Sequence, residues 1–321
     1  MGSYLPINKC SNEHLSNFVD TSDEWISKRS GIKNRHFVTD NEKTSDMSFF
    51  AANKAIENAE ISKKDIDLIV LATTTPDNTF PSTATLVQKK LEINAVSFDI
   101  QAVCAGFVFA LSVAKSMMTE GNYKNCLVIG ADSMSKLLDW NDRSTSVLFG
   151  DGAGAVILQK FENTECKYDD WGILSNVIHS DGQFYDLLKT NGGVSTNQRV
   201  GFIEMEGKEV FKHAVDKLSS SLEEALIASN KNIDELDYLV PHQANQRIIL
   251  AVADRMKIDV SKVVSTVKDH GNTSAASIPL ALENAINSNK ILNGNLIGIQ
   301  AIGGGLSWGA SIIRIGKPKN L

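Results

Sequence analysis

Cys104 is the first residue of this chain whose type and position could support nucleophilic chemistry. Residues 96–100 read as a short buried strand, and from Ala105 onward the apolar residues recur at helical spacing. Cys104 is therefore predicted where a strand gives way to a helix, and there the helix dipole and unpaired N–H groups favour a thiolate. A buried cysteine can also act simply as a small apolar side chain. If it is a nucleophile, alkylation is expected well below pH ~8.5, the pKa of an unperturbed thiol.

A second candidate, His242, comes from a repeat in the chain. The strand-like segment DIDLIV at 65–70 matches ELDYLV at 235–240 at an offset of 170, and NCLVIG at 125–130 matches NLIGIQ at 295–300 at the same offset. Pro241 ends the second-half strand and His242 follows it, at the strand end where open α/β sheets bind ligands. Aligning Val96 with Val264, at an offset of 168, places Asn272 opposite Cys104.

The repeat predicts a duplicated α/β fold with a mainly parallel sheet in each half. Polarity rises over residues 160–168, so the expected domains are 1–163, which carries the cysteine, and 164–321, which carries the histidine and asparagine. Two related halves would pack about a pseudo-twofold axis. Cys104, His242 and Asn272 are then expected in one cleft.

Composition excludes several other classes of protein. The 321 residues are 42% hydrophobic, with a formal net charge of −6 and no basic run, which argues against a nucleic-acid partner. The four cysteines are far apart, with no CxxC pair, so neither a disulfide framework nor a metal site is predicted. We find no signal peptide and no apolar run of the ~18 residues that a membrane span needs. A cytoplasmic protein with no membrane partner is expected.

A Cys, His and Asn set could also describe a thiol protease, in which the asparagine orients the histidine. The local sequence signatures of those proteases are absent, and a duplicated parallel α/β frame does not suit them.

Six motifs in order resemble the thiolase-like condensing enzymes, and most closely the β-ketoacyl-acyl-carrier-protein synthase III family. They are TSDEWISKRSGI, VCAGF, FGDGAGA, VPHQAN, HGNTSAAS and IGGGLSWG, and together they extend over nearly the whole chain. The resemblance implies a five-layered thiolase-like fold with two αβαβα-type halves. It also implies a homodimer.

The resemblance implies a decarboxylating condensation that initiates fatty acid biosynthesis. Cys104 would accept an acyl group, expected to be acetyl, from acyl-CoA, with no cofactor beyond the CoA thioester itself. Malonyl-acyl-carrier protein would then lose CO2, with His242 and Asn272 donating to its thioester oxygen. The oxyanion of acyl transfer would be bound by the backbone N–H groups of Cys104 and Gly304, where glycine allows close approach.

The resemblance also assigns binding roles to residues at matching positions. Phe80 would cross the dimer interface to shape the partner's acyl pocket, and Ile302 stands beside the active site where the family often has Phe. The CoA-binding residues would be Thr21, Trp25, Arg29, Arg143, Gly207, Phe211 and Asn245. The carrier-protein-binding residues would be Lys212, Arg247 and Arg255, although solvated charge is the simpler explanation for each one.

Several alternatives stay open from the sequence. A related ketosynthase or acyltransferase could load an unusual starter in secondary metabolism, and a duplicated scaffold could bind acyl-CoA or carrier protein without turnover. A thiolase would need a second cysteine near the C-terminal glycines, but no cysteine follows Cys166, and no glutamate near Phe80 suggests a 3-hydroxy-3-methylglutaryl-CoA synthase. The chain also has fewer residues before Tyr4 than the family usually has, so the first sheet is expected to lack a strand unless the start is truncated.

Overall fold

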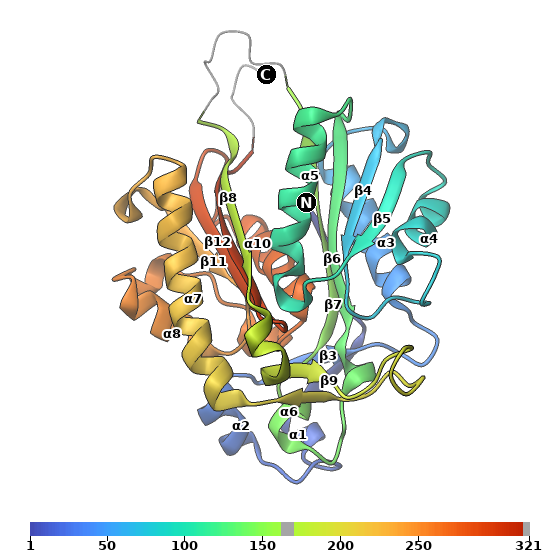
Figure 1. The fold of residues 1–321 in the computed structure, drawn as a ribbon, viewed down its shortest axis with the longest axis vertical. Helices are drawn as coiled ribbons and strands as arrows, with labels where there is room; N and C mark the ends of the chain where they lie inside the picture. Colours follow the sequence, from blue (N-terminus) through green and yellow to red (C-terminus); the bar gives the residue numbers. More distant parts are fainter. Residues whose placement is uncertain (162–169, 317–321) are drawn as a thin grey trace.

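The computed structural model describes residues 1–161 and 170–316. The predicted boundary between residues 163 and 164 lies outside the described residues, as does Cys166. The described part of the chain forms two main sheets with helices on both sides of each (Figure 1).

The first sheet has five strands in the order β1-β7-β6-β4-β5. Parallel pairing joins β4 to its neighbours β5 and β6, while β7 and β1 are added in antiparallel orientation. The strands are β1 (Gly2–Tyr4), β4 (Leu68–Ala72), β5 (Val96–Ile100), β6 (Asn125–Ser133) and β7 (Asp151–Gln159). The expectation that the first sheet lacks a strand is therefore wrong, because β1 occupies the edge of that sheet next to β7. Gly2 permits this, since a Cβ there would lie 2.4 Å from the Ala51 carbonyl oxygen.

The second sheet repeats this plan with four strands in the order β11-β12-β13-β8. The β11 and β12 pair is parallel, and the β12–β13 and β13–β8 pairs are antiparallel. Its strands are β8 (Gly172–Ser180), β11 (Tyr238–Pro241), β12 (Leu296–Gly303) and β13 (Ser307–Arg314). Two short antiparallel pairs complete the strands, β2 (Asn8–Ser11) with β3 (Asn34–Phe37) and β9 (Leu188–Thr190) with β10 (Ile203–Met205).

The helices form three layers around the two sheets (Figure 1). Helices α3 (Thr44–Asn58) and α4 (Thr83–Leu91) cover the outer face of the first sheet, and α7 (Gly207–Ala228) and α8 (Gln246–Arg255) cover that of the second. Helices α5 (Gly106–Glu120) and α10 (Ser277–Asn287) lie between the sheets and contact both. This arrangement confirms the predicted five-layered α/β fold. Parallel pairing joins β4 to β5 and β6 in the first sheet and β11 to β12 in the second, and the other strand pairs of both sheets are antiparallel.

Shorter helices connect these layers. The α-helical ones are α1 (Asn12–Leu15), α2 (Asp23–Ser30), α6 (Arg143–Ser146) and α9 (Val267–His270). The 3₁₀ helices are η1 (Lys63–Asp65), η2 (Val103–Ala105), η3 (Met134–Leu137), η4 (Gly182–Leu187), η5 (Ile233–Glu235), η6 (Val260–Lys262) and η7 (Ser274–Ala276). Helix α2 begins and ends as its sequence predicts, because Ser22 Oγ accepts the Trp25 N–H and Gly31 ends it at φ +77°.

Helix α5 owes its apolar sequence to its central position. The residues predicted from helical spacing to face inward are buried: Phe107, Ala110, Leu111, Ala114 and Met118. Residues 103–120 have the length and mean hydropathy, 1.3, of a membrane span. Because α5 packs against β4 and β6 on one side and β8 and β12 on the other, we interpret it as a core helix.

Left-handed backbone positions show the duplication independently of side-chain similarity. Glu60 and Asn230, 170 positions apart (230 − 60), both have φ of +54° at the end of an outer helix. Val103 (φ +48°) and Ser274 (φ +50°), 171 positions apart (274 − 103), both open the turn before a central helix. This second pair corrects one prediction. The residue equivalent to Cys104 is Ala275, and Asn272 lies three positions earlier, because α9 and Gly271 add residues before the second turn.

Candidate active site

Cys104 lies in η2, the single turn between β5 and α5, as the sequence predicts. Val103 before it adopts the left-handed conformation at φ +48°, which is unusual for a β-branched residue and turns the chain sharply. The turn packs tightly, because a Cβ on Gly106 would lie 3.0 Å from Ala72 Cβ and 3.4 Å from Ala275 Cβ. The cysteine is thereby held between the two halves of the molecule.

The electrostatic state of Cys104 differs from the prediction. The side chain is only 4% exposed, and burial raises the pKa of its thiol to about 12, with the negative charge of Asp132 adding to the increase. The expected lowered pKa is therefore wrong for this structure. The prediction weighed the helix dipole, whereas removal of the thiolate from water is the larger effect.

His242 follows β11, and its backbone N–H donates to the Gln300 carbonyl oxygen at 2.7 Å. Its imidazole is buried, and burial lowers the pKa to about 3, so the ring is neutral. Ring Nδ1 lies 2.6 Å from Ser277 Oγ, which also accepts the Gln243 N–H at 3.3 Å. Ser277 Oγ can donate its hydrogen to Nδ1 while it accepts from Gln243, and we interpret the contact in this direction. The imidazole proton is then on Nε2, which makes Nε2 a neutral donor.

Asn272 is fixed by its backbone and by its side-chain oxygen. Its N–H donates to the Leu148 carbonyl oxygen and its own carbonyl oxygen accepts the Gly150 N–H, both at 2.9 Å, which ties it to the first half. Its Oδ1 accepts the Ser274 N–H at 2.9 Å. The carboxamide therefore has its oxygen engaged and its Nδ2 amide as the group that can donate to a ligand.

Residues 272–277 connect the three predicted catalytic residues. Ser274 lies against Cys104 and affects the pKa of its thiol, its backbone binds Asn272, and Ser277 binds His242. Helical turns η2 and η7 are also in direct contact, which brings the N-terminal ends of α5 and α10 together. The structure thus places the three side chains around one segment, at the junction of the two halves.

The glycines after β12 approach the Cys104 turn. A Cβ on Gly303 would lie 2.7 Å from the Cys104 backbone nitrogen, and a Cβ on Gly304 would lie 2.6 Å from the Leu188 carbonyl oxygen. Only glycine fits at either position. Gly303 is therefore the residue packed on the Cys104 amide, and the oxyanion role of the adjacent Gly304 N–H stays a prediction.

A group of cationic and aromatic side chains matches part of the predicted CoA site. The guanidinium carbons of Arg29 and Arg143 lie 4.8 and 5.2 Å from the centre of the Trp25 ring. Arg143 also donates to the Asp20 carbonyl oxygen at 3.1 Å. Three residues predicted to bind CoA, two on α2 and one on α6, thus lie together, with both guanidinium groups near the indole ring.

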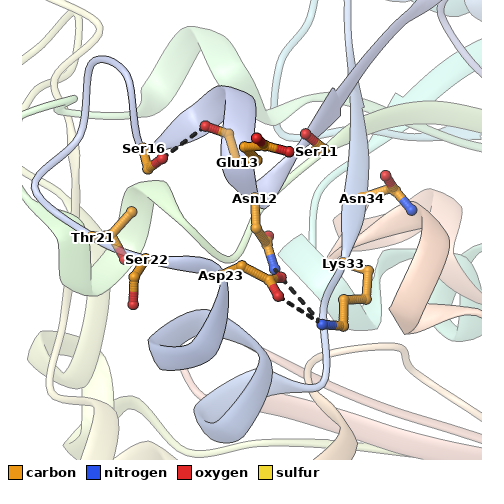
Figure 2. Close-up of a pocket in the computed structure, with 9 residues that line it drawn as sticks. All are labelled: Ser11, Asn12, Glu13, Ser16, Thr21, Ser22, Asp23, Lys33 and Asn34. Carbon is orange, nitrogen blue, oxygen red and sulfur yellow. Dashed lines mark hydrogen bonds and ion pairs between the residues drawn. The ribbon is translucent and has the colours of Figure 1, made fainter.

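Thr21 lines a polar surface pocket of about 430 Å³ beside this group (Figure 2). Figure 2 shows Asn12 and Lys33 converging on the Asp23 carboxylate there, with a Lys33 Nζ to Asp23 Oδ2 distance of 2.9 Å. A second pocket of about 530 Å³ lies between α6 and β10, with acidic residues such as Asp142 and Glu204 in its wall. Neither pocket includes Cys104, His242 or Asn272, which are 4%, 3% and 6% exposed.

The other predicted CoA residues lie on α7 and at the start of α8. Gly207 begins α7, and Phe211 follows one turn later with Arg247 at 5.4 Å over its ring. Asn245 caps α8, since its Oδ1 accepts the Ile248 N–H at 3.0 Å. Helix α8 contacts both α7 and α2, so these residues and Trp25 belong to adjoining elements.

The residues predicted for the acyl pocket and for carrier-protein binding lie in different environments. Ile302 is buried in the core under α7 and α8, whereas Phe80 is 83% exposed. Lys212, Arg247 and Arg255 are all exposed on α7 and α8, and Arg255 is paired with Asp216 at 2.8 Å. Within this chain Phe80 and Ile302 therefore do not share a pocket wall.

Sequence reasoning did not find Asp132, Ser274 or Ser277, although each contacts a predicted catalytic residue or its support. Asp132 could have been found, because it is a lone carboxylate at the end of the apolar strand NCLVIGAD, the same signal that identified His242. The two serines sit in HGNTSAAS, where nothing in the sequence separates them from other small polar residues.

Comparison with known proteins gives family matches in both halves of the chain. Residues 98–182 match the family model for 3-oxoacyl-[acyl-carrier-protein] synthase III, and residues 226–315 match the model for its C-terminal part. The chain is 54% identical over 316 residues to the β-ketoacyl-[acyl-carrier-protein] synthase III of Ehrlichia canis, covering 98% of each chain. It is 51% identical over 314 residues to that of Rhodospirillum centenum, covering 98% of this chain and 97% of the relative.

A solved structure shows the same fold. The crystal structure of 3-oxoacyl-[acyl-carrier-protein] synthase III from Aquifex aeolicus superposes with a TM-score of 0.90 at 44% identity, and the match covers 98% of both chains.

Proposed function

The chain belongs to the β-ketoacyl-[acyl-carrier-protein] synthase III family, and from this we propose that it condenses an acyl-CoA primer with malonyl-acyl-carrier protein. The product is a 3-oxoacyl-acyl-carrier protein, which initiates fatty acid biosynthesis. The observation that carries the proposal is that Ser274 and Ser277 lie in one short segment. Ser274 lies against Cys104 and binds Asn272, and Ser277 binds His242, so the segment joins a nucleophile to two neutral donors. We propose acetyl-CoA as the primer.

In the first half-reaction the Cys104 sulfur attacks the thioester carbonyl of acyl-CoA. The new bond joins the acyl carbon to Sγ, the bond to the CoA sulfur breaks, and the thiol proton passes overall to the released CoA thiolate. Backbone N–H groups of Cys104 and Gly304 bind the oxyanion that forms on the way. Because burial keeps the thiol protonated, this step relies on the arriving thioester and its leaving group to accept the proton.

In the second half-reaction the malonyl thioester loses CO2 and becomes an enolate. His242 Nε2–H and Asn272 Nδ2–H donate to the thioester oxygen, where negative charge develops. Neutral donors held in a dry site are worth about 3–4 kcal/mol each toward such a charge. The enolate carbon then attacks the acyl-Cys104 carbonyl, the bond from that carbon to Sγ breaks, and the Cys104 thiolate takes up one proton from water. Decarboxylation supplies the carbanion, so we propose that the reaction needs neither a cofactor nor a metal.

Two substrate surfaces follow from the site residues. We propose that the CoA adenine stacks on Trp25, with Arg143 on its other face, and that Arg29 contacts a CoA phosphate. Thr21 and Asn245 are proposed to line the channel for the nucleotide and pantetheine parts of CoA. Carrier protein is proposed to dock on the exposed basic residues of α7 and α8. Of the three predicted there, Lys212 and Arg247 are the stronger candidates, since Arg255 already has an acidic partner.

We also propose a homodimer in the cytoplasm. Two features support the dimer: β5 is an edge strand of its sheet, with Val96 48% exposed, and Phe80 is an 83% exposed aromatic side chain. A second copy that covered these groups would remove apolar surface from water, and it would allow Phe80 to reach the partner's acyl pocket.

An acyl-CoA panel assayed with malonyl-acyl-carrier protein tests the function. The expected result is formation of 3-oxoacyl-acyl-carrier protein with equimolar CO2 and CoA, with acetyl-CoA as the best primer. Acyl-Cys104 formation without CO2 release would contradict condensation and support a scaffold or loading role. A secondary-metabolism starter enzyme is not favoured, because relatives more than 50% identical over nearly the whole chain carry the synthase III name.

A further inference from the structure

Arg35 on β3 is a fully buried cation that the proposed mechanism does not use. Its Nη1 donates to Asn12 Oδ1 at 2.7 Å and to the Cys10 carbonyl oxygen at 3.4 Å, and its Nη2 donates to the Val147 carbonyl oxygen at 2.8 Å. These three acceptors are neutral. Burying a cation against neutral acceptors costs free energy that burying an apolar side chain of the same size does not. We therefore expect Arg35 to contribute geometry rather than stability.

One arm of the guanidinium, its Nη2 hydrogen bond, holds residues 147–150, the segment to which the backbone of Asn272 is tied. Asn272 donates its N–H to this segment and accepts an N–H from it, both at 2.9 Å. The stem of Arg35 packs on the same pairing, because a Cβ on Gly150 would lie 3.0 Å from Arg35 Cβ and one on Gly271 would lie 3.2 Å from it. Arg35 thus contacts the chain on both sides of the Asn272 backbone pairing.

Strand β3 is also bonded to α9, the helix that ends two residues before Asn272. The Lys33 N–H, just before β3, donates to the Lys268 carbonyl oxygen in α9 at 2.7 Å. The side-chain amide of Asn34 donates to Asp269 Oδ1 in the same helix at 3.2 Å. The strand therefore fixes the chain before Asn272 directly and the segment opposite Asn272 through the guanidinium.

The other arm of the guanidinium, the Nη1 hydrogen bond to Asn12, supports α2. Asn12 is buried, and its Nδ2 donates to Asp23 Oδ1 at 2.8 Å and to the Ile32 carbonyl oxygen at 2.7 Å (Figure 2). Asp23 opens α2 and Ile32 lies two residues beyond its end, so Asn12 binds the chain at both ends of the helix. Helix α2 carries Trp25, the residue proposed to stack on the CoA adenine. Arg35 is thus connected to the CoA-binding helix through one side chain.

We propose that Arg35 is a positioning residue for two parts of the active site: its Nη2 arm fixes the backbone of Asn272 for decarboxylation, and its Nη1 arm, through Asn12, fixes α2 for the binding of acyl-CoA. The catalytic part of this inference rests on the proposed function. A planar guanidinium donates in two fixed directions at once, which a lysine ammonium group does not reproduce. Because Arg35 is fully buried, it acts through these neighbours rather than on a substrate.

The Arg35→Lys variant tests the Asn272 arm. Lysine keeps the positive charge and the aliphatic stem, but it cannot donate to Asn12 and to residues 147–150 together. CO2 release from malonyl-acyl-carrier protein should fall about tenfold or more, because misplacing an orienting group by about 1 Å can cost a hundredfold in rate. Acyl transfer to Cys104 at saturating acyl-CoA should change by less than about threefold, since the backbone oxyanion hole keeps its contacts. Intact-mass measurement and CO2 release on one preparation give both values.

The Asn12→Asp variant tests the α2 arm separately. The aspartate can still accept from Arg35, but it has no N–H to donate to Asp23 or Ile32, and its charge repels the Asp23 carboxylate. KM for acyl-CoA should rise about two- to tenfold, the range expected when the stacking contribution of Trp25 is lost. CO2 release at saturating malonyl-acyl-carrier protein should stay unchanged, because the other arm of the guanidinium is intact.

Ile56→Ala is the matched control for loss of stability. Ile56 is buried in the apolar cluster between α3 and the first sheet, and its side chain has no polar atom that could take part in either arm. The variant should lower the unfolding temperature and leave KM and CO2 release unchanged. Amide hydrogen exchange adds a measurement that needs no turnover: exchange in residues 267–277 should be faster in Arg35→Lys than in wild type and unchanged in Ile56→Ala.

These measurements separate the inference from the proposed function. Loss of CO2 release in Arg35→Lys, a raised KM alone in Asn12→Asp and neither effect in Ile56→Ala support the inference. If the wild type does not condense, the proposed function fails, while faster exchange in residues 267–277 of Arg35→Lys alone still supports the positioning of Asn272. Wild-type CO2 release in Arg35→Lys would overturn the inference. Equal loss of CO2 release in Arg35→Lys and Ile56→Ala would also overturn it, because that pattern reports only a loosened fold.

Discussion

The hydrogen bond between Ser277 and His242 gives the most direct means of testing the donor role of the imidazole. Ser277 Oγ lies 2.6 Å from Nδ1, and both residues are buried, at 1% and 3% exposure. In Ser277→Ala, Nδ1 becomes a buried acceptor with no partner, which costs about 1–3 kcal/mol. The imidazole can avoid that cost by moving its proton to Nδ1 or by rotating, and either change removes the Nε2–H donor.

We expect this perturbation to act on one half-reaction. Losing part of a donor worth about 3–4 kcal/mol should reduce CO2 release from malonyl-acyl-carrier protein by about ten- to a hundredfold, or about 1.4–2.7 kcal/mol. Acyl transfer to Cys104 should change by less than about threefold, because the backbone oxyanion hole is untouched. The assays are intact-mass measurement of acyl-Cys104 and CO2 release by the same preparation.

Ser48→Ala is the matched control for this variant. Ser48 is a fully buried helix serine whose Oγ donates to the Thr44 carbonyl oxygen at 2.7 Å, and α3 lies on the outer face of the first sheet. It should lose a comparable amount of stability and keep both half-reactions. Equal loss of acylation and decarboxylation in Ser277→Ala, or no loss of decarboxylation, would refute the tautomer argument.

Three other predictions follow from the site. In Trp25→Ala, KM for acyl-CoA should rise about two- to tenfold with kcat unchanged, since the ring contributes about 0.5–1.5 kcal/mol of stacking; a fall in kcat alone would contradict a binding role. Because burial lowers the pKa of His242 from 6.5 to about 3, its neutral ring stabilises the fold above pH 6.5. That contribution should be lost as pH falls from 6.5 toward 3, and urea unfolding of wild type and His242→Phe should show it. Alkylation of Cys104 should keep rising through about pH 10, and a plateau near pH 8 would contradict the raised pKa.

Much of the fold could be predicted because its signals are local. The strand at 96–100, the inward-facing residues of α5 and the ends of α2 follow from apolar spacing and from the capping residues Ser22 and Gly31. The duplication was also visible, since DIDLIV and ELDYLV occupy equivalent strands β4 and β11.

The register of the second catalytic turn could not be predicted in the same way. Matching Val96 to Val264 placed Asn272 opposite Cys104, but the extra turn of α9 shifts the equivalence to Ala275. Asn272 nevertheless lies beside the Cys104 turn, because its backbone pairs with residues 148–150 of the first half. That pairing is a tertiary contact with no local sequence signal.

The charge state of the nucleophile depends on tertiary structure to a greater degree still. The position of Cys104 at a helix start was readable from sequence, and it argued for a thiolate. Its burial between the halves and the nearby Asp132 carboxylate raise the pKa instead. Both effects come from residues distant in sequence, so the direction of the pKa shift of Cys104 could be found only from the three-dimensional structure.

The division of labour between Cys104 and His242 is the central claim, and His242→Ala tests it most directly. Acyl-Cys104 formation and CO2 release would be measured on the same protein, in parallel with wild type. We predict near-normal acylation by acetyl-CoA, with decarboxylation lower by about a hundredfold or more. Equal loss of both steps would contradict the account, because the imidazole would then be needed to form the thioester as well as the enolate.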